Sequence, residues 1–264
     1  MRKIYRKPHR IKRKKSIIHN RFFRLGILFF ILAFLLFYSF TFFNFFQIKK
    51  IIILGETISE ETAKEIKLTV EENINKKILS LFHTKSIFLA NSSQLTKNIL
   101  DDFPEIFSIK ISKDFPDVLN ISVDKREGVA VFSSGEQNFL IDKEGIIFDF
   151  ALSEDLSLNI TNNQKIGPFT LGEKVIKEDL LSQILKVQSK LQEDSDIFAA
   201  EFFLISEERI NVKTSEGWEI YFNPKKDLDW QLTELNLVLE RKIPKAKRGD
   251  LEYIDLRFSR VYYK

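Results

Sequence analysis

The chain has 264 residues, of which 44% are hydrophobic and 26 are Phe, with 9 Gly, 6 Pro and no Cys. This composition excludes a fibrous or disordered chain, and the lack of cysteine excludes disulfide bonds, cysteine-based metal sites and a thiol nucleophile. The formal net charge of +4 combines two unlike regions: residues 1–46 hold 11 Lys and Arg and no acid, whereas residues 47–264 hold 30 Lys and Arg and 37 Asp and Glu, a net charge of −7. The basic charge therefore belongs to one short segment, which argues against a nucleic-acid-binding domain.

Residues 25–46 form an uncharged run of 22 residues that is rich in Phe and Leu. As a helix this run is about 33 Å long, enough to cross a hydrocarbon core of about 30 Å. A cleaved signal peptide has a shorter apolar region and a small-residue cleavage site, for which only Ser39 and Thr41 offer a weak match. A buried helix of a soluble domain requires no flank of basic residues. We therefore predict a single uncleaved transmembrane helix over residues 25–46.

The basic segment sets the expected orientation of this helix. Because Lys and Arg accumulate on the cytoplasmic side of membrane proteins, residues 1–24 are predicted to lie in the cytoplasm and residues 47–264 outside the cytoplasmic membrane. The basic tail is expected to contact anionic membrane lipid. Docking to nucleic acid or to a protein is the alternative, but runs such as RIKRKK (residues 10–15) are too common to indicate it.

Residues 47–126 are predicted to fold as a β-α-α-β-β domain. A short apolar strand over 48–54 precedes a helix whose N-cap candidate is Ser59. A second helix is expected to begin at Ser92 or Ser93 and to end before Pro104. Apolar and polar residues then alternate in two runs, which predicts a hairpin with one buried face. The apolar positions of the hairpin are Phe107, Ile109, Ile111, Leu119, Ile121 and Val123. Together these elements predict a three-stranded sheet with two helices on one side.

Residues 127–264 predict a β-rich domain with flanking helices. Apolar residues at helical spacing mark helices over 180–191 and 228–239, and the polar stretch 159–172 is expected to be a loop. The expected strands are 129–132, 139–142, 146–150, 199–205, 209–214, 218–222 and 252–258, the last with a continuation to Lys264. The fold class is therefore α+β.

The ordered set of these elements resembles the FtsQ/DivIB family of bacterial cell-division proteins. Local strings carry the resemblance, from FQIKKIIILG at residues 46–55 through FPEI at 103–106, FPDVLNISV at 115–123, KREGVA at 125–130 and DKEGIIF at 142–148 to YIDLRF at 253–258. The resemblance implies that residues 47–126 are a POTRA-like domain and that residues 127–264 are the family's β-rich domain. The chain departs from the family pattern at Glu127-Gly128, where Pro is more usual after the first residue.

The resemblance also implies a function: a non-enzymatic scaffold of the division septum that binds FtsB/DivIC-type and FtsL-type membrane partners. A partner segment can add as a strand to the edge of the antiparallel sheet that is expected to end the chain. We expect the partner-binding residues in the apolar, aromatic and basic segment at that edge. They are Tyr253, Leu256, Arg257, Phe258, Val261, Tyr262 and Tyr263. Leu256, Phe258 and Val261 are expected to face the core, and Tyr253, Arg257 and Tyr263 to face a partner.

Catalytic chemistry has little support in the sequence. His83 is the one histidine after the membrane helix, and the acidic pairs Asp101-Asp102 and Asp194-Ser-Asp196 lack the ligand spacing of a metal site. We therefore predict no catalytic residue, metal, cofactor or small-molecule substrate. Two alternatives stay open: another membrane-anchored POTRA protein in envelope assembly or transport, and a membrane-anchored hydrolase with a carboxylate pair.

Overall fold

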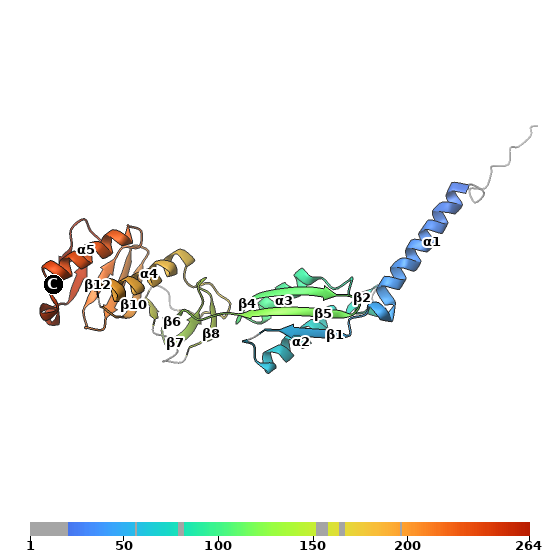
Figure 1. Ribbon diagram of the computed structural model, residues 1–264, viewed down its shortest axis with the longest axis horizontal. Coiled ribbons are helices and arrows are strands. Elements are labelled where there is room, and N and C mark those ends of the chain that lie inside the picture. The colour runs from blue at the N-terminus through green and yellow to red at the C-terminus, as the bar shows by residue number, and fades with distance from the viewer. Residues whose placement is uncertain (1–20, 56, 79–81, 152–157, 164–166, 196) are drawn as a thin grey trace, which may run out of the picture. The chain divides into compact units, whose positions relative to one another are not determined.

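The computed structural model describes residues 21–55, 57–78, 82–151, 158–163, 167–195 and 197–264. Most of the predicted basic tail, residues 1–20, lies outside the described residues. The chain is α+β, with an apolar N-terminal helix followed by mixed helices and strands and a β-rich C-terminal region (Figure 1). This agrees with the predicted fold class.

The chain divides into two compact units. The first unit comprises residues 1–52, 67–95 and 111–120, and the second unit comprises residues 53–66, 96–110 and 121–264. This division does not coincide with the predicted domain boundary between residues 126 and 127, which stays a prediction.

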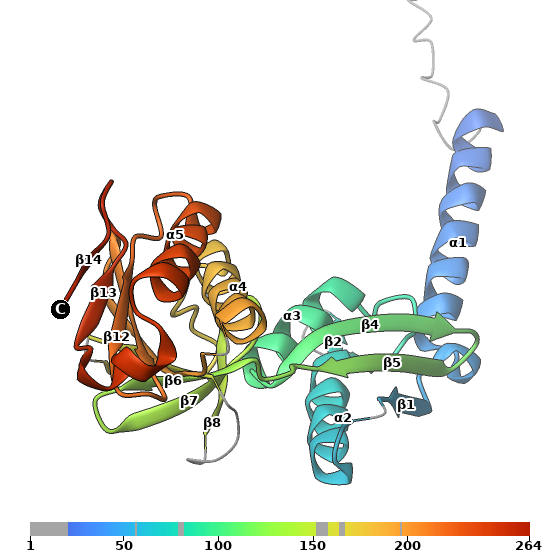
Figure 2. The ribbon, with the colours of Figure 1, turned by 60° about the vertical axis from the view of Figure 1, so that its left-hand side comes forward.

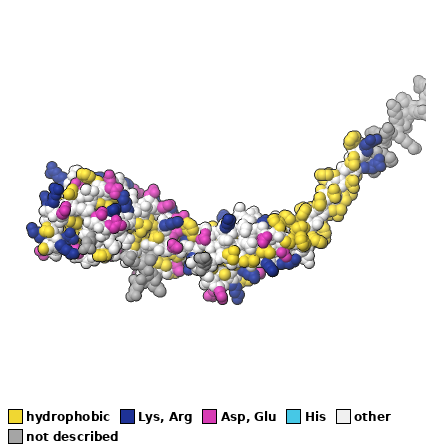
Figure 3. All heavy atoms as spheres, viewed as in Figure 1, with side chains coloured by type: hydrophobic (Ala, Val, Ile, Leu, Met, Phe, Trp, Pro, Cys, Tyr) yellow, Lys and Arg dark blue, Asp and Glu magenta, His cyan; other side chains and the backbone are white. Residues whose placement is uncertain are grey.

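Helix α1 spans Arg21–Phe42, and its length and apolar composition allow it to cross a membrane. Hydrophobic side chains cover its surface (Figure 3). The helix ends four residues before the predicted end at Phe46 and is already formed at Arg21, the first described residue. The membrane-spanning segment 25–46 stays a prediction. The helix stops because Phe43 is extended, with φ −69° and ψ 128°, and the short 3₁₀ helix η2, Asn44–Phe46, follows it. An apolar run indicates which residues avoid water and does not mark where the helix ends.

The predicted β-α-α-β-β order is confirmed. The elements are β1 Lys50–Leu54, α2 Glu60–Ile74, α3 Ser92–Asp102, β4 Ile106–Asp114 and β5 Val118–Lys125, and the sheet order is β1-β5-β4. The Ser59 hydroxyl accepts a hydrogen bond from the Thr62 amide at 3.0 Å, as expected of an N-cap. The cap of α3 is Asn91, not Ser92 or Ser93, because the Asn91 side-chain oxygen accepts from the Gln94 amide at 3.3 Å. The sequence analysis missed a small antiparallel hairpin, β2 Lys76–Ile78 with β3 Phe82–Thr84.

The second unit contains a nine-stranded sheet in the order β14-β13-β12-β11-β10-β9-β6-β7-β8. The sheet is mixed, because β9 lies parallel to both β6 and β10 and β12 lies parallel to β13. The expected antiparallel sheet at the end of the chain is therefore wrong in part. Its strands are β6 Ala130–Ser134, β7 Gln137–Ile141, β8 Ile147–Phe150, β9 Asn159–Asn162, β10 Ala199–Ser206, β11 Arg209–Thr214, β12 Glu219–Phe222, β13 Tyr253–Asp255 and β14 Tyr262–Tyr263.

Strand β9 lies in the polar stretch that the sequence predicted to be a loop. Its Ile160 pairs in register with Phe132 of β6 and Phe202 of β10, and all three side chains are buried. A four-residue strand with one buried residue gives too short an alternation to be recognised. It nevertheless joins the β6-β7-β8 strands to the rest of the sheet.

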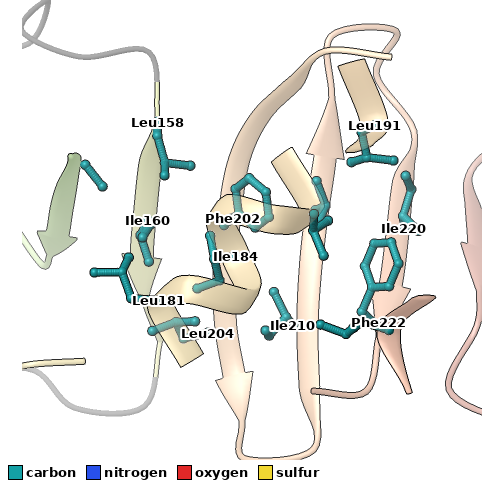
Figure 4. Close-up of a cluster of buried hydrophobic side chains, with 14 of the residues drawn as sticks. Leu158, Ile160, Leu181, Ile184, Leu191, Phe202, Leu204, Ile210, Ile220 and Phe222 are labelled. Carbon is teal, nitrogen blue, oxygen red and sulfur yellow. The ribbon is translucent and has the colours of Figure 1, made fainter. Parts of the chain in front are cut away.

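Helices α4, Glu178–Ser195, and α5, Leu228–Arg241, pack next to each other against the sheet (Figure 2). Their apolar residues join one core with the inward residues of the strands (Figure 4). Apolar spacing from Leu180 predicts Leu180, Ile184, Val187 and Leu191 as the inward residues of α4. The last three are buried, but Leu181, and not Leu180, is the fully buried residue of the first turn. Asp227 caps α5 by accepting from the Trp230 amide. This core fixes the positions of β12 and β13, which carry the candidate site.

Candidate partner-binding surface at strands β13 and β14

The predicted strand 252–258 is wrong in its extent, since β13 ends at Asp255 and the chain returns as β14. The two strands are antiparallel, with Ile254 opposite Tyr263 and Asp255 opposite Tyr262. The turn has a local cause: the Asp255 carboxylate accepts a hydrogen bond from the Arg257 amide at 3.1 Å, which favours a turn over extended backbone. The segment after Phe258 therefore does not continue the strand but forms the next one in the sheet.

The two edges of the nine-stranded sheet differ. The edge at β8 is covered at its first residue, because the Ile147 amide donates to the Glu173 carbonyl and the Gly172 amide donates to the Ile147 carbonyl. At the other end β14 is the outermost strand among the described residues, next to β13 (Figure 2). The open edge of the sheet is therefore β14.

The pairing of β14 shows which of its backbone groups face outward. Tyr253 and Lys264 exchange hydrogen bonds in both directions, at 3.2 and 3.3 Å, so they form a hydrogen-bonded pair. In an antiparallel ladder the next pair, Ile254 with Tyr263, is not hydrogen-bonded across the ladder. The amide and carbonyl of Tyr263 consequently point away from β13, toward the open edge. An added strand can bond to these two groups.

The faces of β13 and β14 follow from the same register. Tyr262 shares a face with Asp255 and Tyr253, whereas Tyr263 shares the face of the buried Ile254. Tyr263 therefore does not share the face of Tyr253, as was expected, but its side chain is 47% exposed and that of Tyr262 is 54% exposed. Contact of either side chain with a partner stays a prediction.

The other predicted site residues differ in whether their side chains are buried or exposed. Leu256 is 3% exposed and belongs to the core, and Val261 packs against that core, as expected of inward residues. Phe258 was expected to face the core but is 55% exposed, because the turn after Asp255 carries it outward. Its ring contacts Tyr262 edge to face, at a centroid distance of 5.9 Å. The structure thus brings Phe258 and Tyr262 together as exposed aromatic side chains beside the open edge.

A stack of aromatic and guanidinium groups lies on the Tyr253 face of the sheet. Tyr221 of β12 stacks on Tyr253, with ring centroids 5.1 Å apart and planes 13° apart. The Arg209 guanidinium lies 4.4 Å from the Tyr221 ring centroid, and that of Arg257 lies 5.6 Å from it. Sequence reasoning missed Tyr221 and Arg209. A signal was available for Tyr221, which alternates with the buried Ile220 and Phe222.

Asp255 and Arg257 form the charged centre of this surface. The guanidinium donates to both carboxylate oxygens, at 2.9 and 2.6 Å, and Asp255 is only 6% exposed. Burial by itself raises the pKa of Asp255, but the hydrogen bonds and the charge of Arg257 outweigh burial and hold that pKa below its ordinary value. The same hydrogen bonds raise the pKa of Arg257. Arg257, predicted to face a partner, thus also holds the turn between β13 and β14.

Replacing Arg257 with Ala should destabilise the second unit by about 1–3 kcal/mol, because the buried Asp255 carboxylate loses its charged partner. In the wild type the lowered pKa of Asp255 stabilises the fold above the unfolded-state value of about 4, and this stabilisation is lost as the pH falls through the folded-state value. In Arg257→Ala, burial of Asp255 is opposed only by the backbone amide and by Arg209, so its pKa rises and the acid-dependent loss of stability should shrink. Urea unfolding at pH 7 and pH 3.5, followed by tryptophan fluorescence, measures both effects.

The matched control for this variant is Lys264→Ala, which removes an exposed ion pair with Glu252 at 2.9 Å. Such exposed pairs contribute little to stability, so the unfolding curve should not move. An Arg257→Ala protein with wild-type stability at both pH values would contradict the assigned role of the Asp255 pair.

The acidic residues that were weighed as catalytic or metal-binding residues do not come together in one site. Asp101 and Asp102 are exposed at the end of α3, and Asp194 lies 3.8 Å from the Lys190 ammonium. Asp196 and the side chain of His83 lie outside the described residues. Within the described ranges, no group of three or more His, Cys, Asp and Glu side chains could hold a metal ion.

A hollow near the predicted domain junction has a volume of about 310 Å³ and is lined in part by Asp124, Glu127 and Asp142. Asp142 is 2% exposed and is engaged on both oxygens: Arg126 pairs with one, and the amides of Glu144 and Ile146 donate to the other, each at 3.0 Å. These bonds assign Asp142 a structural role in the turn before β8. They leave it poorly suited to act as a general acid or base.

A comparison of the sequence with models of protein families finds a match that covers most strands of the nine-stranded sheet. Residues 130–257 match the family model described as Cell division protein FtsQ/DivIB, C-terminal. The match runs from β6 through β13 and ends at Arg257, so β14 lies beyond the matched residues. No curated protein matches the chain. Residues 130–257 therefore belong to the FtsQ/DivIB family of cell-division proteins, and the α+β fold of the chain and its apolar helix, which fits a single-pass membrane protein, agree with that assignment.

Proposed function

We propose that the protein is a non-enzymatic, single-pass scaffold of the division machinery that binds a partner strand at the edge of β14. The family supplies the cell-division role, and it is a family of non-catalytic scaffolds. The resemblance noted in the sequence favours FtsB/DivIC-type and FtsL-type membrane proteins as the partners. The N-terminus would lie in the cytoplasm, with the basic tail on anionic lipid and residues 47–264 outside the membrane at the septum.

One observation carries the proposal: β14 is the open edge of the sheet and the backbone of Tyr263 faces outward from it. Unpaired amide and carbonyl groups at a sheet edge favour the addition of an extended segment. The exposed side chains of Phe258 and Tyr262 lie beside this edge and supply aromatic contacts of the kind enriched at interfaces. The backbone would supply affinity, and these side chains would supply specificity.

The surface charge near the edge favours a partner with acidic residues. Residues 252–264 hold Arg257, Arg260 and Lys264 against Glu252 and Asp255, a net charge of +1 (3 − 2), whereas residues 47–264 as a whole carry a net negative charge. Because Arg257 and Lys264 pair with Asp255 and Glu252, Arg260, between β13 and β14, supplies the excess positive charge. Opposite charges on the partner would speed association and disfavour other segments.

Co-purification of the full chain with its FtsB/DivIC-type and FtsL-type partners tests the proposal. Removal of residues 259–264 is a poor variant for this purpose, because it deletes β14 and uncovers β13 as a new open edge. Two variants avoid this problem: Tyr263→Pro, which removes the outward amide, and Phe258→Ala with Tyr262→Ala, which removes the exposed rings. Co-purification that both variants reduce would support the proposed site. Wild-type recovery of both partners with both variants would overturn it.

A further inference from the structure

Beside the C-terminal end of α1, the first unit carries a cluster of exposed apolar residues, most of them aromatic. We call this cluster the juxtamembrane patch. Its members are exposed to between 37% and 58% and come from three separate segments. They are Phe43, Phe45, Phe88, Leu89 and Phe115. We propose that this patch is a second membrane-contact surface, which lies in the interfacial region of the lipid bilayer beside the end of α1.

The patch is bound directly to α1. The Ser86 hydroxyl donates to the Phe40 carbonyl at 2.7 Å, and Thr84 and Gln47 donate to the Thr41 carbonyl at 2.5 and 2.8 Å. These three side chains satisfy carbonyl groups of the last helical turn, which have no partner within a helix. The segment that carries Phe88 is therefore held against the end of α1.

Aromatic contacts extend this attachment. The ring centroids of Phe40 and Phe46 lie 5.1 and 5.2 Å from that of Phe88, and the Phe115 centroid lies 5.3 Å from it. The hydrophobic surface of α1 continues onto the adjoining end of the first unit (Figure 3). All of these aromatic residues belong to the first unit.

The geometry of a membrane helix then places the patch at lipid. Helix α1 has 22 residues and is about 33 Å long, so it spans a hydrocarbon core of about 30 Å with almost no length left over. Residues held against its last turn must lie at the level of the lipid headgroups. Aromatic side chains are favoured there, and large exposed apolar clusters on a water-facing surface are uncommon.

The charges around the patch are compatible with lipid. The same three segments contain four lysines, Lys49, Lys50, Lys85 and Lys113, against two carboxylates, Asp114 and Asp117. Asp117 pairs with Lys49 at 3.2 Å, which reduces its effective charge. The pair neutralises Lys49 as well, so Lys50, Lys85 and Lys113 stand against Asp114, a net charge of +2 (3 − 1), which matches an anionic lipid surface. We therefore assign a lipid surface, and not a protein, as the occupant of the patch.

The natural lack of cysteine allows a direct test with single-cysteine variants of the full chain. Phe115→Cys and Phe45→Cys, labelled with the environment-sensitive dye NBD, are placed in nanodiscs of phosphatidylethanolamine and phosphatidylglycerol, with one chain in each disc and no other protein. The expected result is a blue-shifted emission and a loss of intensity with headgroup-proximal doxyl lipids at both positions. Phe150→Cys is the matched control, since Phe150 is similarly exposed but belongs to the second unit.

Leu32→Cys, in the middle of α1, separates the inference from the membrane assignment on which it rests. If the Leu32 probe is buried in lipid while the Phe115 and Phe45 probes behave like Phe150, the lipid assignment is overturned and a protein partner becomes the better occupant. If the Leu32 probe also reports water, α1 does not span the bilayer and the inference falls with its premise. Lipid burial of all three probes, with Phe150 in water, supports the inference.

Discussion

Replacing Tyr263 with Pro should weaken partner binding by about 10- to 100-fold while leaving the second unit folded. The amide of Tyr263 points away from β13, so proline removes a donor that β13 does not use. The added ring occupies the position that a partner strand must approach, and the partner carbonyl is left without a hydrogen bond. Proline is tolerated on edge strands where the amide faces solvent. Isothermal titration of the full chain with the partner's extracytoplasmic region measures the loss.

Tyr263→Ala is the matched control, because it truncates the same side chain and keeps the amide. If the backbone carries the affinity, Tyr263→Ala should bind more tightly than Tyr263→Pro. Equal losses of affinity for the two variants would show that the tyrosine ring of Tyr263 makes the contact with the partner and that strand addition is wrong. Wild-type affinity of Tyr263→Pro would exclude this edge altogether.

Replacing Gly145 with Ala should strongly destabilise the second unit. Gly145 has φ +77°, and a Cβ at this position would overlap the backbone carbonyl of Ile176. Left-handed backbone costs a residue with a side chain about 1–2 kcal/mol, and overpacking against a rigid neighbour adds about 1–3 kcal/mol. The Gly145 carbonyl also accepts from the Val175 amide at 2.9 Å, so the substitution should loosen the segment that covers β8.

Gly217→Ala separates the two causes. Gly217 has φ +99° but nothing lies within 4 Å of its hypothetical Cβ, so only the backbone cost of about 1–2 kcal/mol applies. Both tryptophans, Trp218 and Trp230, lie in the second unit, and urea unfolding followed by their fluorescence reports on it. Equal stability losses for the two variants would contradict the assigned contact between Gly145 and Ile176.

Much of the fold was predictable where apolar residues repeat over many positions. The helices over 178–195 and 228–241 and the hairpin of β4 and β5 show sustained periodicity, and Ser59 supplies a recognisable cap. Gly145, which the structure places at a positive φ, is the kind of residue that marks a turn in a sequence. These features depend on local chemistry that the sequence states directly.

The prediction failed where tertiary contacts decide. Strand β9 is extended because Ile160 lies between Phe132 and Phe202, which are distant in sequence. The last turn of α1 is held by Thr84 and Ser86, which lie far from it along the chain. The return of β14 depends on a side-chain hydrogen bond of Asp255, so a continuous strand to the end of the chain was the simpler interpretation of the sequence.

The position of the segment from Tyr253 to Tyr263 in the sheet was predicted better than the orientation of its single residues, and its role in partner binding stays a prediction. The segment from Tyr253 to Tyr263 does lie at the open edge of the sheet, but Leu256 is core and Phe258 is exposed, the reverse of what simple alternation predicts for Phe258. Tyr221 and Arg209 join Tyr253 from neighbouring strands through the sheet register. A register between separate strands cannot be obtained from one segment alone.

The most direct test of the central claim is hydrogen–deuterium exchange at single-residue resolution, on the full chain with and without its FtsB/DivIC-type partner. Strand addition at β14 predicts that the Tyr263 amide, which points outward in the free protein, becomes protected when the partner binds. The Ile147 amide of β8, which already donates to the Glu173 carbonyl, should exchange equally in both states. Partner binding that leaves the Tyr263 amide unprotected would contradict the account.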